Sequence, residues 1–163
     1  MPSPSAPSKP GAPHIKIVAQ NRKALFEYTV EKRLECGIVL VGTEVKSLRA
    51  GSCQLSDAYA VGQRGELVLL NMQIAAYGPA GILANHPGKR ARKLLAKKRE
   101  IDQLLEKQTK AGYALVPLSV YFKDGKVKVE LGLCKGKDGA DKRDSIATRE
   151  AQREMDRAVI RRR

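Results

Sequence analysis

The stretch from Phe26 to Leu40 constrains the fold most, because apolar residues fall on nearly every second position. Phe26, Tyr28, Val30, Leu34, Cys36, Ile38 and Leu40 make up the set, and only Lys32 interrupts it. A period of two over this length predicts a long strand with one face turned inward. Gly37 lies inside that strand, where glycine commonly marks a bulge or a sharp bend. A long first strand that bends can serve two sides of a small barrel.

A short helix is expected directly after this strand. Thr43 can cap its start, Glu44 falls in the first turn where an acid suits the helix dipole, and Gly51 ends it. Strands are predicted over 55–61 and 66–76, joined by "GQRG", and over 114–122 and 126–134, joined at Asp124-Gly125.

A long helix is predicted over 89–111, between the third and fourth strands. Leu94, Ile101, Leu104 and Leu105 form a one-sided apolar stripe along it, and Gly112 is the stop. Five short strands with a helix in this place are typical of an OB-type Greek-key barrel. We therefore predict a mainly β fold, with one domain over residues 16–134.

Both ends of the chain differ in composition from this domain. Residues 1–15 hold five prolines mixed with Ser and Ala, which predicts a disordered leader. Residues 135–163 carry ten basic and six acidic side chains and only a thin apolar stripe. We expect this basic tail to be disordered when free and to fold as a helix on a partner.

The net charge of +14 indicates a partner that carries phosphates, or an anionic membrane surface. Nine Lys or Arg against three acids fall between Lys89 and Lys110, which favours a nucleic acid. The alternative is a solvated helix face whose basic stems cover apolar surface. Because only seven aromatic residues are present, folded RNA recognised by shape is favoured over single strands read by stacking. The net charge by itself does not exclude DNA as the partner.

Signatures of enzymes, metal sites and membrane segments are not found in the sequence. There is no phosphate-binding glycine loop, His-Glu-x-x-His or Gly-x-Ser-x-Gly motif, and His86 is the only histidine outside the leader. Three widely spaced cysteines indicate neither a disulfide framework nor a zinc site. No apolar run reaches the roughly 20 residues of a membrane span. We therefore expect a cytoplasmic, non-enzymatic protein without cofactor, metal or small-molecule substrate.

Several segments together resemble the SsrA-binding protein family, also called small protein B, which binds transfer-messenger RNA (tmRNA). The matching segments are "NRKALFEY", "GIVLVGTEVKSLRAG", "RKLL", "VPLSVYF" and "GLCKGKDGADKR". The resemblance implies an OB-type barrel with added helices and a C-terminal tail. It also implies an adaptor that binds the tRNA-like part of tmRNA and delivers it, with elongation factor Tu, to stalled ribosomes. The nascent peptide is then tagged for degradation.

The family's functional residues carry over to two groups of positions. The resemblance implies RNA contacts at Asn21, Arg22, Lys23, Glu44, Lys46, Arg49, Asn85, Arg92, Lys93 and Lys128. It places the tail in the empty messenger channel of the ribosome, with Lys135, Gly136, Lys137, Asp141, Lys142 and Arg143 at the start of that segment. The chain departs from the family at Pro87-Gly88, at Asp138 and in lacking an aromatic residue in mid-tail.

Two interpretations of Glu44 stay open at this point, as does a second function. Glu44 can support the short helix, or it can accept hydrogen bonds from RNA among Lys46 and Arg49. A general RNA-binding OB protein of the ribosomal or cold-shock type is the alternative to the tmRNA adaptor.

Overall fold

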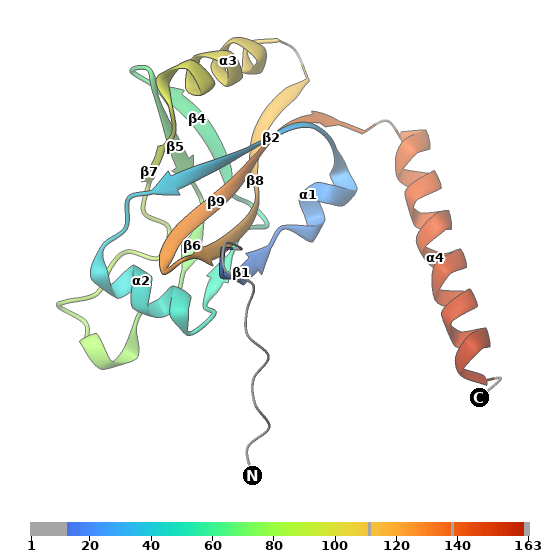
Figure 1. Ribbon diagram of the computed structural model, residues 1–163, viewed down its shortest axis with the longest axis horizontal. Helices are drawn as coiled ribbons and strands as arrows, with labels where there is room; N and C mark the ends of the chain where they lie inside the picture. Colours follow the sequence, from blue (N-terminus) through green and yellow to red (C-terminus); the bar gives the residue numbers. More distant parts are fainter. Residues whose placement is uncertain (1–12, 111, 138, 162–163) are drawn as a thin grey trace.

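The computed structural model describes residues 13–110, 112–137 and 139–161 (Figure 1). The strands are β1 (Ile15–Gln20), β2 (Tyr28–Ile38), β3 (Cys53–Gln54), β4 (Tyr59–Gln63), β5 (Glu66–Leu70), β6 (Gln73–Ile74), β7 (Arg92–Leu95), β8 (Tyr113–Lys123) and β9 (Lys126–Gly136). The helices are α1 (Arg22–Glu27), α2 (Gly42–Arg49), the short 3₁₀ turn η1 (Gly78–Ala80), α3 (Lys98–Gln108) and α4 (Gly139–Arg161).

A closed antiparallel barrel forms the centre of the fold. Its strands follow the order β8-β4-β5-β7-β2-β9, and a further β8–β9 pairing closes the ring, while β1 adds to the other edge of β8. Helix α3 lies at one end of the barrel (Figure 1) and contributes Ile101 and Leu104 to its core. The predicted mainly β, OB-type fold is confirmed, with α2 after the long strand and α3 before the final hairpin.

Strand β2 serves two sides of the barrel, as its length suggested. It pairs with β9 from Tyr28 to Gly37 and with β7 at Gly37 and Ile38. Of the bulge or sharp bend expected at Gly37, the bulge is not there, because the register shift lies between Val30 and Lys32. Gly37 instead sits where both neighbours meet, and a Cβ there would lie 3.3 Å from the Cβ of Leu95.

In β2 and in β8, a bulge divides the alternating apolar residues between two hydrophobic clusters, one outside the barrel and one inside it. Before the shift, Tyr28 and Val30 pack on a small outer cluster with α1, whereas Leu34 and Cys36 lie in the barrel interior. Strand β8 repeats this at its shift between Pro117 and Ser119. Its even-numbered residues Val116 and Leu118 pack outside, and Val120 and Phe122 pack inside. The extra residue in a bulge reverses the face on which the following side chains lie. Lys32, which interrupts the apolar pattern of the sequence, lies next to the bulge in β2.

The predicted helix over 89–111 is wrong in its first half. Residues Arg92–Leu95 form strand β7, which pairs with β5 and β2, and α3 begins only at Lys98. Arg92 and Leu94 are buried while Lys93 and Leu95 are exposed. This period of two is a strand pattern, but over four residues it cannot be told from part of a helical stripe.

Smaller corrections concern the ends of strands. The first long strand starts at Tyr28 rather than Phe26, since Asn21 caps α1 and Phe26 lies in that helix. The predicted strand over 66–76 is interrupted at Asn71, whose φ is 59°. The strand expected over 55–61 lies at Tyr59–Gln63.

Both predicted hairpins are confirmed, and they have the same turn. Arg64-Gly65 and Asp124-Gly125 each have two consecutive positive φ angles, of 50° and 75° and of 50° and 79°. Positive φ at both central residues is the type I′ geometry, which matches the twist of paired strands. The glycine in each turn accepts this geometry without strain from a Cβ.

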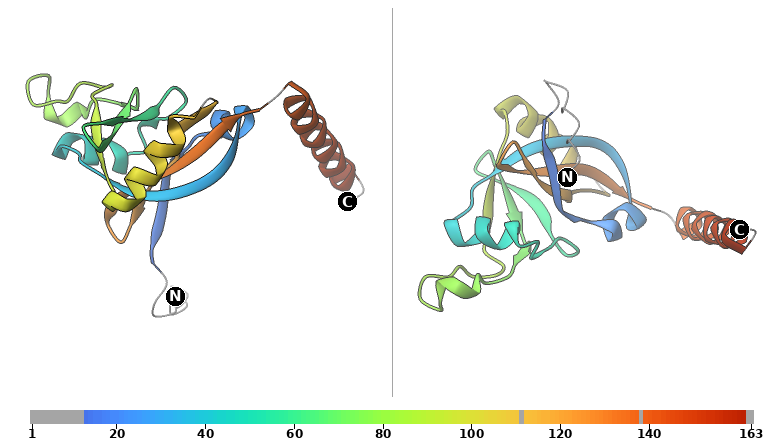
Figure 2. Two further views of the ribbon diagram at one scale, coloured as in Figure 1. Left: turned by 90° about the horizontal axis from the view of Figure 1, so that it is seen from above. Right: turned by 60° about the horizontal axis from the view of Figure 1, so that its bottom comes forward.

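The first and last described elements, β1 and α4, lie outside the closed barrel. Most of the predicted leader, residues 1–12, lies outside the described residues, and Ile15 already belongs to β1. The tail forms helix α4, which extends away from the barrel in all views (Figures 1 and 2). Its described contact with α1 includes the Arg149 guanidinium 5.6 Å from the centre of the Phe26 ring. The prediction that the tail is disordered when free stays a prediction.

Within the described ranges, no helix has the length and apolar character that crossing a membrane requires.

Candidate nucleic-acid interface

Helix α2 is held to the barrel by a buried carboxylate, Glu44. Its side chain is fully buried, and Oε1 accepts from the backbone N–H of Val41 at 3.1 Å and from Nη2 of Arg90 at 2.6 Å. Its Oε2 accepts from Nε of Arg92, which is also fully buried. One acid therefore closes the helix start and pairs with two arginines from the strand and loop across from it.

Arg92 also binds backbone carbonyls of the segments next to β7. Its Nη1 donates to the carbonyls of Met72 at 2.6 Å and Arg90 at 3.0 Å, and its Nη2 donates to the carbonyl of Gly88 at 3.2 Å. A guanidinium offers five donors in a fixed planar geometry. Arg92 thus joins α2, the end of β5 and the start of β7 through one side chain.

His86 makes a second connection between α2 and the loop that precedes β7. Its Nε2 lies 3.1 Å from the carbonyl oxygen of Ile74, and its Nδ1 lies 2.9 Å from Oγ1 of Thr43. Because a carbonyl only accepts, Nε2 carries the hydrogen, and in the neutral ring Nδ1 accepts from the Thr43 hydroxyl. His86 is buried and acts as a structural bridge.

The ionised state of Glu44 is favoured by its partners. Burial alone would raise the pKa of Glu44, but hydrogen bonds from Arg90, the Val41 N–H and Arg92 outweigh it and hold the pKa below its ordinary value. A buried ion pair is sustained only when its charges are matched and its hydrogen bonds are satisfied. The Glu44–Arg90–Arg92 network meets that condition for the carboxylate.

Three of the residues expected to contact RNA are buried in the structure. Glu44 and Arg92 are fully buried, and Asn21 is 2% exposed. The Asn21 amide donates to the carbonyls of Leu55 at 3.1 Å and Pro117 at 3.0 Å, and its oxygen accepts from the Ala24 N–H at 3.1 Å. Since these side chains have protein partners and almost no accessible surface, their role in this structure is to hold the neighbouring surface in place, and a direct contact with RNA stays a prediction.

Exposed cations lie beside the buried network. Lys46 and Arg49 project from α2, and Lys93 is on the outer face of β7, where it pairs with Glu66 at 2.7 Å. Lys46 also places its Nζ 5.5 Å from the centre of the Tyr77 ring, at the start of the loop. Lys46 and Arg49 thus lie on the exposed side of one helix, and Lys93 follows Arg92 along β7; we refer to these three cations as the α2 face.

Asn85 is half-buried and holds the loop that borders the α2 face. Its Oδ1 accepts from the Tyr77 N–H at 2.9 Å, and its Nδ2 donates to the carbonyls of Tyr77 at 2.8 Å and Gly81 at 3.0 Å. The main hydrogen-bonding role of the Asn85 side chain is therefore to fold residues 77–85 into a defined loop.

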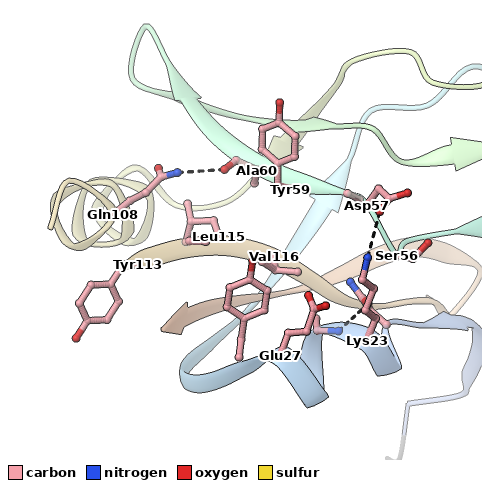
Figure 3. Close-up of a pocket in the computed structure, with 15 residues that line it drawn as sticks. Lys23, Glu27, Ser56, Asp57, Tyr59, Ala60, Gln108, Tyr113, Leu115 and Val116 are labelled. Atoms are coloured by element: carbon pink, nitrogen blue, oxygen red, sulfur yellow. Dashed lines mark hydrogen bonds and ion pairs between the residues drawn. The ribbon is translucent and has the colours of Figure 1, made fainter. Parts of the chain in front are cut away.

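Arg22 and Lys23 lie on α1, at a different end of the barrel from α2 (Figures 1 and 2). Lys23 borders a groove of about 390 Å³ between α1, β4 and the end of α3 (Figure 3). Three of the five tyrosines, Tyr28, Tyr59 and Tyr113, line it, together with the Lys23–Asp57 ion pair at 3.5 Å. Sequence reasoning missed this cluster because its members are 31 to 85 positions apart in pairs and share no motif.

The remaining expected residues follow β9 into the tail. Lys128 lies on β9 opposite Gly37, and Lys135 and Gly136 end that strand. Lys135 lies with its Nζ 5.9 Å from the Tyr113 ring, and Lys137 donates from Nζ to the carbonyl of Leu25 at 3.3 Å. Asp141, Lys142 and Arg143 fall in the first turns of α4. The tail residues are therefore separate from the α2 face.

No arrangement for metal binding is present in the part of the chain that the structure describes, where no three His, Cys, Asp or Glu side chains gather. The three cysteines are free thiols. Burial raises the pKa of Cys36, Cys53 and Cys134 to about 11 each, so each thiol is protonated at neutral pH and is a poor nucleophile.

Comparison with known proteins identifies the family. The family model described as SmpB protein matches residues 18–161. A protein from Myxococcus xanthus (strain DK1622), named SsrA-binding protein, is 49% identical over 150 residues, which cover 92% of either chain. Another of the same name from Desulforudis audaxviator (strain MP104C) is 56% identical over 144 residues, which cover 88% of this chain and 94% of that protein.

A solved structure agrees with these relatives. It is described as "tmRNA-SmpB: a journey to the center of the bacterial ribosome", and one of its chains is 42% identical with a TM-score of 0.65. The match covers 78% of this chain and 93% of that chain. The shared barrel, the identity over most of the sequence and the matched family model lead to one conclusion: the chain belongs to the SmpB protein family.

Proposed function

We propose that this protein is the RNA-binding adaptor of trans-translation, which binds tmRNA and acts with it on the ribosome. The α2 face carries this proposal, because a buried ion network joins α2, which bears Lys46 and Arg49, to β7, which bears Lys93. Cations carried on firmly held elements of a folded surface suit an RNA that is recognised by shape and backbone. The relatives named SsrA-binding protein and the tmRNA-SmpB structure support the same partners.

In this proposal, two regions of the protein bind different partners. The α2 face, with Lys46, Arg49 and Lys93, binds the tRNA-like part of tmRNA. The tail, beginning at Lys135 and continuing through α4, occupies the empty messenger channel of the ribosome. Elongation factor Tu joins indirectly, through the charged RNA, and the adaptor works in the cytoplasm and catalyses no reaction itself.

Separate placement of the two regions supports this division. Helix α4 extends from the end of β9 near α1, whereas the α2 face lies at another end of the barrel (Figure 1). The tail is a helix with both acidic and basic side chains exposed along its length. One chain can therefore hold an RNA at one end while its tail reaches a different partner.

Binding measured at several salt concentrations tests the RNA assignment. We expect the tRNA-like fragment of tmRNA to bind more tightly than an unrelated RNA hairpin at equal salt. Affinity should fall steeply with salt, because each neutralised phosphate releases counterions. Lys46→Ala should lower the slope of log affinity against log salt by about 1. Equal binding of the two RNAs would contradict the proposal.

Truncation after Gly136 tests whether the α2 face and the tail have separate functions. We expect the shortened protein to keep its affinity for the tRNA-like fragment and to lose tagging on stalled ribosomes in a reconstituted translation system. Loss of both activities to the same extent would show that the two regions are not separable.

A general RNA-binding protein of the ribosomal or cold-shock type is the alternative. The tyrosine-lined groove could stack unpaired bases, but Glu27 and Asp57 also line it, and carboxylates repel a phosphate backbone. Competition with single-stranded RNA distinguishes the two functions. A stacking protein prefers the single strand, whereas the tmRNA adaptor keeps its folded RNA.

A further inference from the structure

The tip of the loop before β7 carries two adjacent aliphatic side chains in full contact with solvent. Ile82 is 96% exposed and Leu83 is 102% exposed. Among the described large apolar side chains, Ile160 in the tail comes next, at 73%. Single exposed aliphatic residues are ordinary, whereas contiguous exposed apolar area points to a contact site.

The loop that presents this pair is held in a defined conformation. Asn85 makes three hydrogen bonds to the backbone of Tyr77 and Gly81, on the N-terminal side of the tip. The 3₁₀ turn Gly78–Ala80 and the positive φ of 72° at Gly81 complete the bend. His86, directly after Asn85, is bonded to Thr43 and Ile74. Because both sides of the tip are fixed to the body, binding through it costs less ordering entropy.

The surroundings of the tip are basic. Lys46 contacts the Tyr77 ring at the start of the loop, and Lys89 and Arg90 follow a few residues after the tip. The Nε of Arg90 is buried with no hydrogen-bond partner, while its Nη2 is held by Glu44. Charge complementarity therefore favours a polyanion as the occupant over an apolar protein surface.

We propose that Ile82 and Leu83 form an apolar wedge that inserts against unstacked bases of the folded RNA bound on the α2 face. The proposal deepens the proposed function and rests on it. Cations beside the wedge hold phosphates, and the aliphatic side chains cover base faces that are exposed where the RNA chain is not helical. Apolar side chains inserted next to base steps are an established way for proteins to recognise deformable or unpaired sites.

The wedge predicts selectivity that lysines alone do not supply. Phosphates are present on every RNA, so the cations of the α2 face bind paired and unpaired regions alike. Burial of an aliphatic side chain gains binding free energy only where a base face is accessible. Next to continuously stacked bases the side chain stays exposed to water. The wedge thus favours RNAs with loops or junctions over continuous duplexes.

The double variant Ile82→Ser with Leu83→Ser tests the wedge through affinity, salt dependence and choice of RNA. Burying one aliphatic side chain corresponds to roughly a tenfold gain in affinity, so we expect at least about a tenfold loss for the tRNA-like fragment of tmRNA. The slope of log affinity against log salt should stay the same, since no charge is removed. Affinity for a continuous RNA duplex of the same length should not change.

Matched variants and a fluorescent RNA complete the design. Ile17→Ser removes an exposed aliphatic side chain from β1, outside the α2 face and the tail, and should leave affinity unchanged. Ile82→Val with Leu83→Met should keep the affinity because the apolar tip remains. The fluorescence of 2-aminopurine at an unpaired position of the fragment should change when the wild-type protein binds. It should change less when the double serine variant binds.

Several outcomes overturn the wedge. One is an unchanged affinity of the double serine variant for the fragment, and another is an equal loss on the continuous duplex. Unchanged RNA affinity combined with weaker recovery of the tmRNA complex on ribosomes would assign the tip to a ribosomal surface. If wild-type protein itself does not prefer the fragment over an unrelated hairpin, the proposed function fails, a result that is distinct from these.

Discussion

Replacing Glu44 with glutamine is the sharpest test of the buried network. The amide keeps the size of the side chain, but it removes the charge that pairs with Arg90 and Arg92. Arg90 can turn toward water because its side chain is 32% exposed, whereas Arg92 has no exposed side chain. The substitution therefore leaves one buried guanidinium without a counter-charge.

The expected loss follows from the environment of Arg92. Breaking a buried ion pair by removing one partner costs roughly 3 to 5 kcal/mol. Arg92 keeps its three carbonyl acceptors, and the amide oxygen can still accept one hydrogen bond, so the lower end applies and we expect about 3 kcal/mol. For a domain of this size that corresponds to a fall in Tm of roughly 10 °C.

Urea unfolding followed by circular dichroism measures this free energy, with Glu66→Gln as the matched control. Glu66 makes an exposed ion pair with Lys93 at 2.7 Å, with side chains 52% and 46% exposed. Exposed pairs contribute at most about 1 kcal/mol. The same acid-to-amide change should therefore have a small effect at Glu66 and a large effect at Glu44.

The pH dependence provides a second measurement on the same variant. Because the folded pKa of Glu44 is lowered, its contribution is complete above the ordinary glutamate value of 4.5 and is lost as pH falls through the folded pKa. The stability difference between wild type and Glu44→Gln should be large at pH 7 and shrink below about pH 4. If Glu44→Gln instead unfolds like wild type at pH 7 and loses RNA affinity alone, Glu44 acts as a direct contact and the network has been misinterpreted.

Three further substitutions or reactions follow from the packing. Gly62→Ala should destabilise the protein by roughly 1 to 3 kcal/mol in urea unfolding, because the new Cβ would lie 2.5 Å from a methyl of Leu105, and a change below about 0.5 kcal/mol would contradict this overpacking. The thiol of Cys36, whose pKa is raised to about 11, should react with a disulfide reagent at pH 7.5 only as fast as the protein unfolds, and a rapid reaction without denaturant would refute its burial. Asn85→Ala should lower affinity for the tRNA-like fragment with little change in Tm, since it frees the Tyr77 backbone in the loop and leaves the barrel core intact; an unchanged affinity would show that the loop need not be held.

Hairpins and barrel order could be predicted because their signals are local. Arg64-Gly65 and Asp124-Gly125 adopt the turn that short hairpins require, whatever the rest of the chain does. The long alternating run likewise became β2, which is paired on both sides of the barrel as expected. The resemblance of the "GTEVKSLRAG" segment to a known family identified the family correctly, whereas the RNA-binding residues near α2 stay a prediction.

Contacts between distant residues decided what local patterns could not. The segment Arg92–Leu95 is compatible with a helical stripe, and it is a strand because β5 and β2 offer open edges on both sides of it. The division of one alternating run between two cores depends on a bulge at a position where no glycine stands.

The sequence by itself determined a basic, mainly β, barrel-forming chain with a charged tail and a family-specific helix after its long strand. Only the tertiary structure decided that Glu44, Arg92 and Asn21 are buried and that Ile82 and Leu83 stand fully in solvent. Charge and hydropathy report what a side chain prefers, whereas burial depends on which distant partners reach it. Arg92 can leave water because Glu44 and three carbonyls, up to 48 positions away, satisfy its charge and its donors.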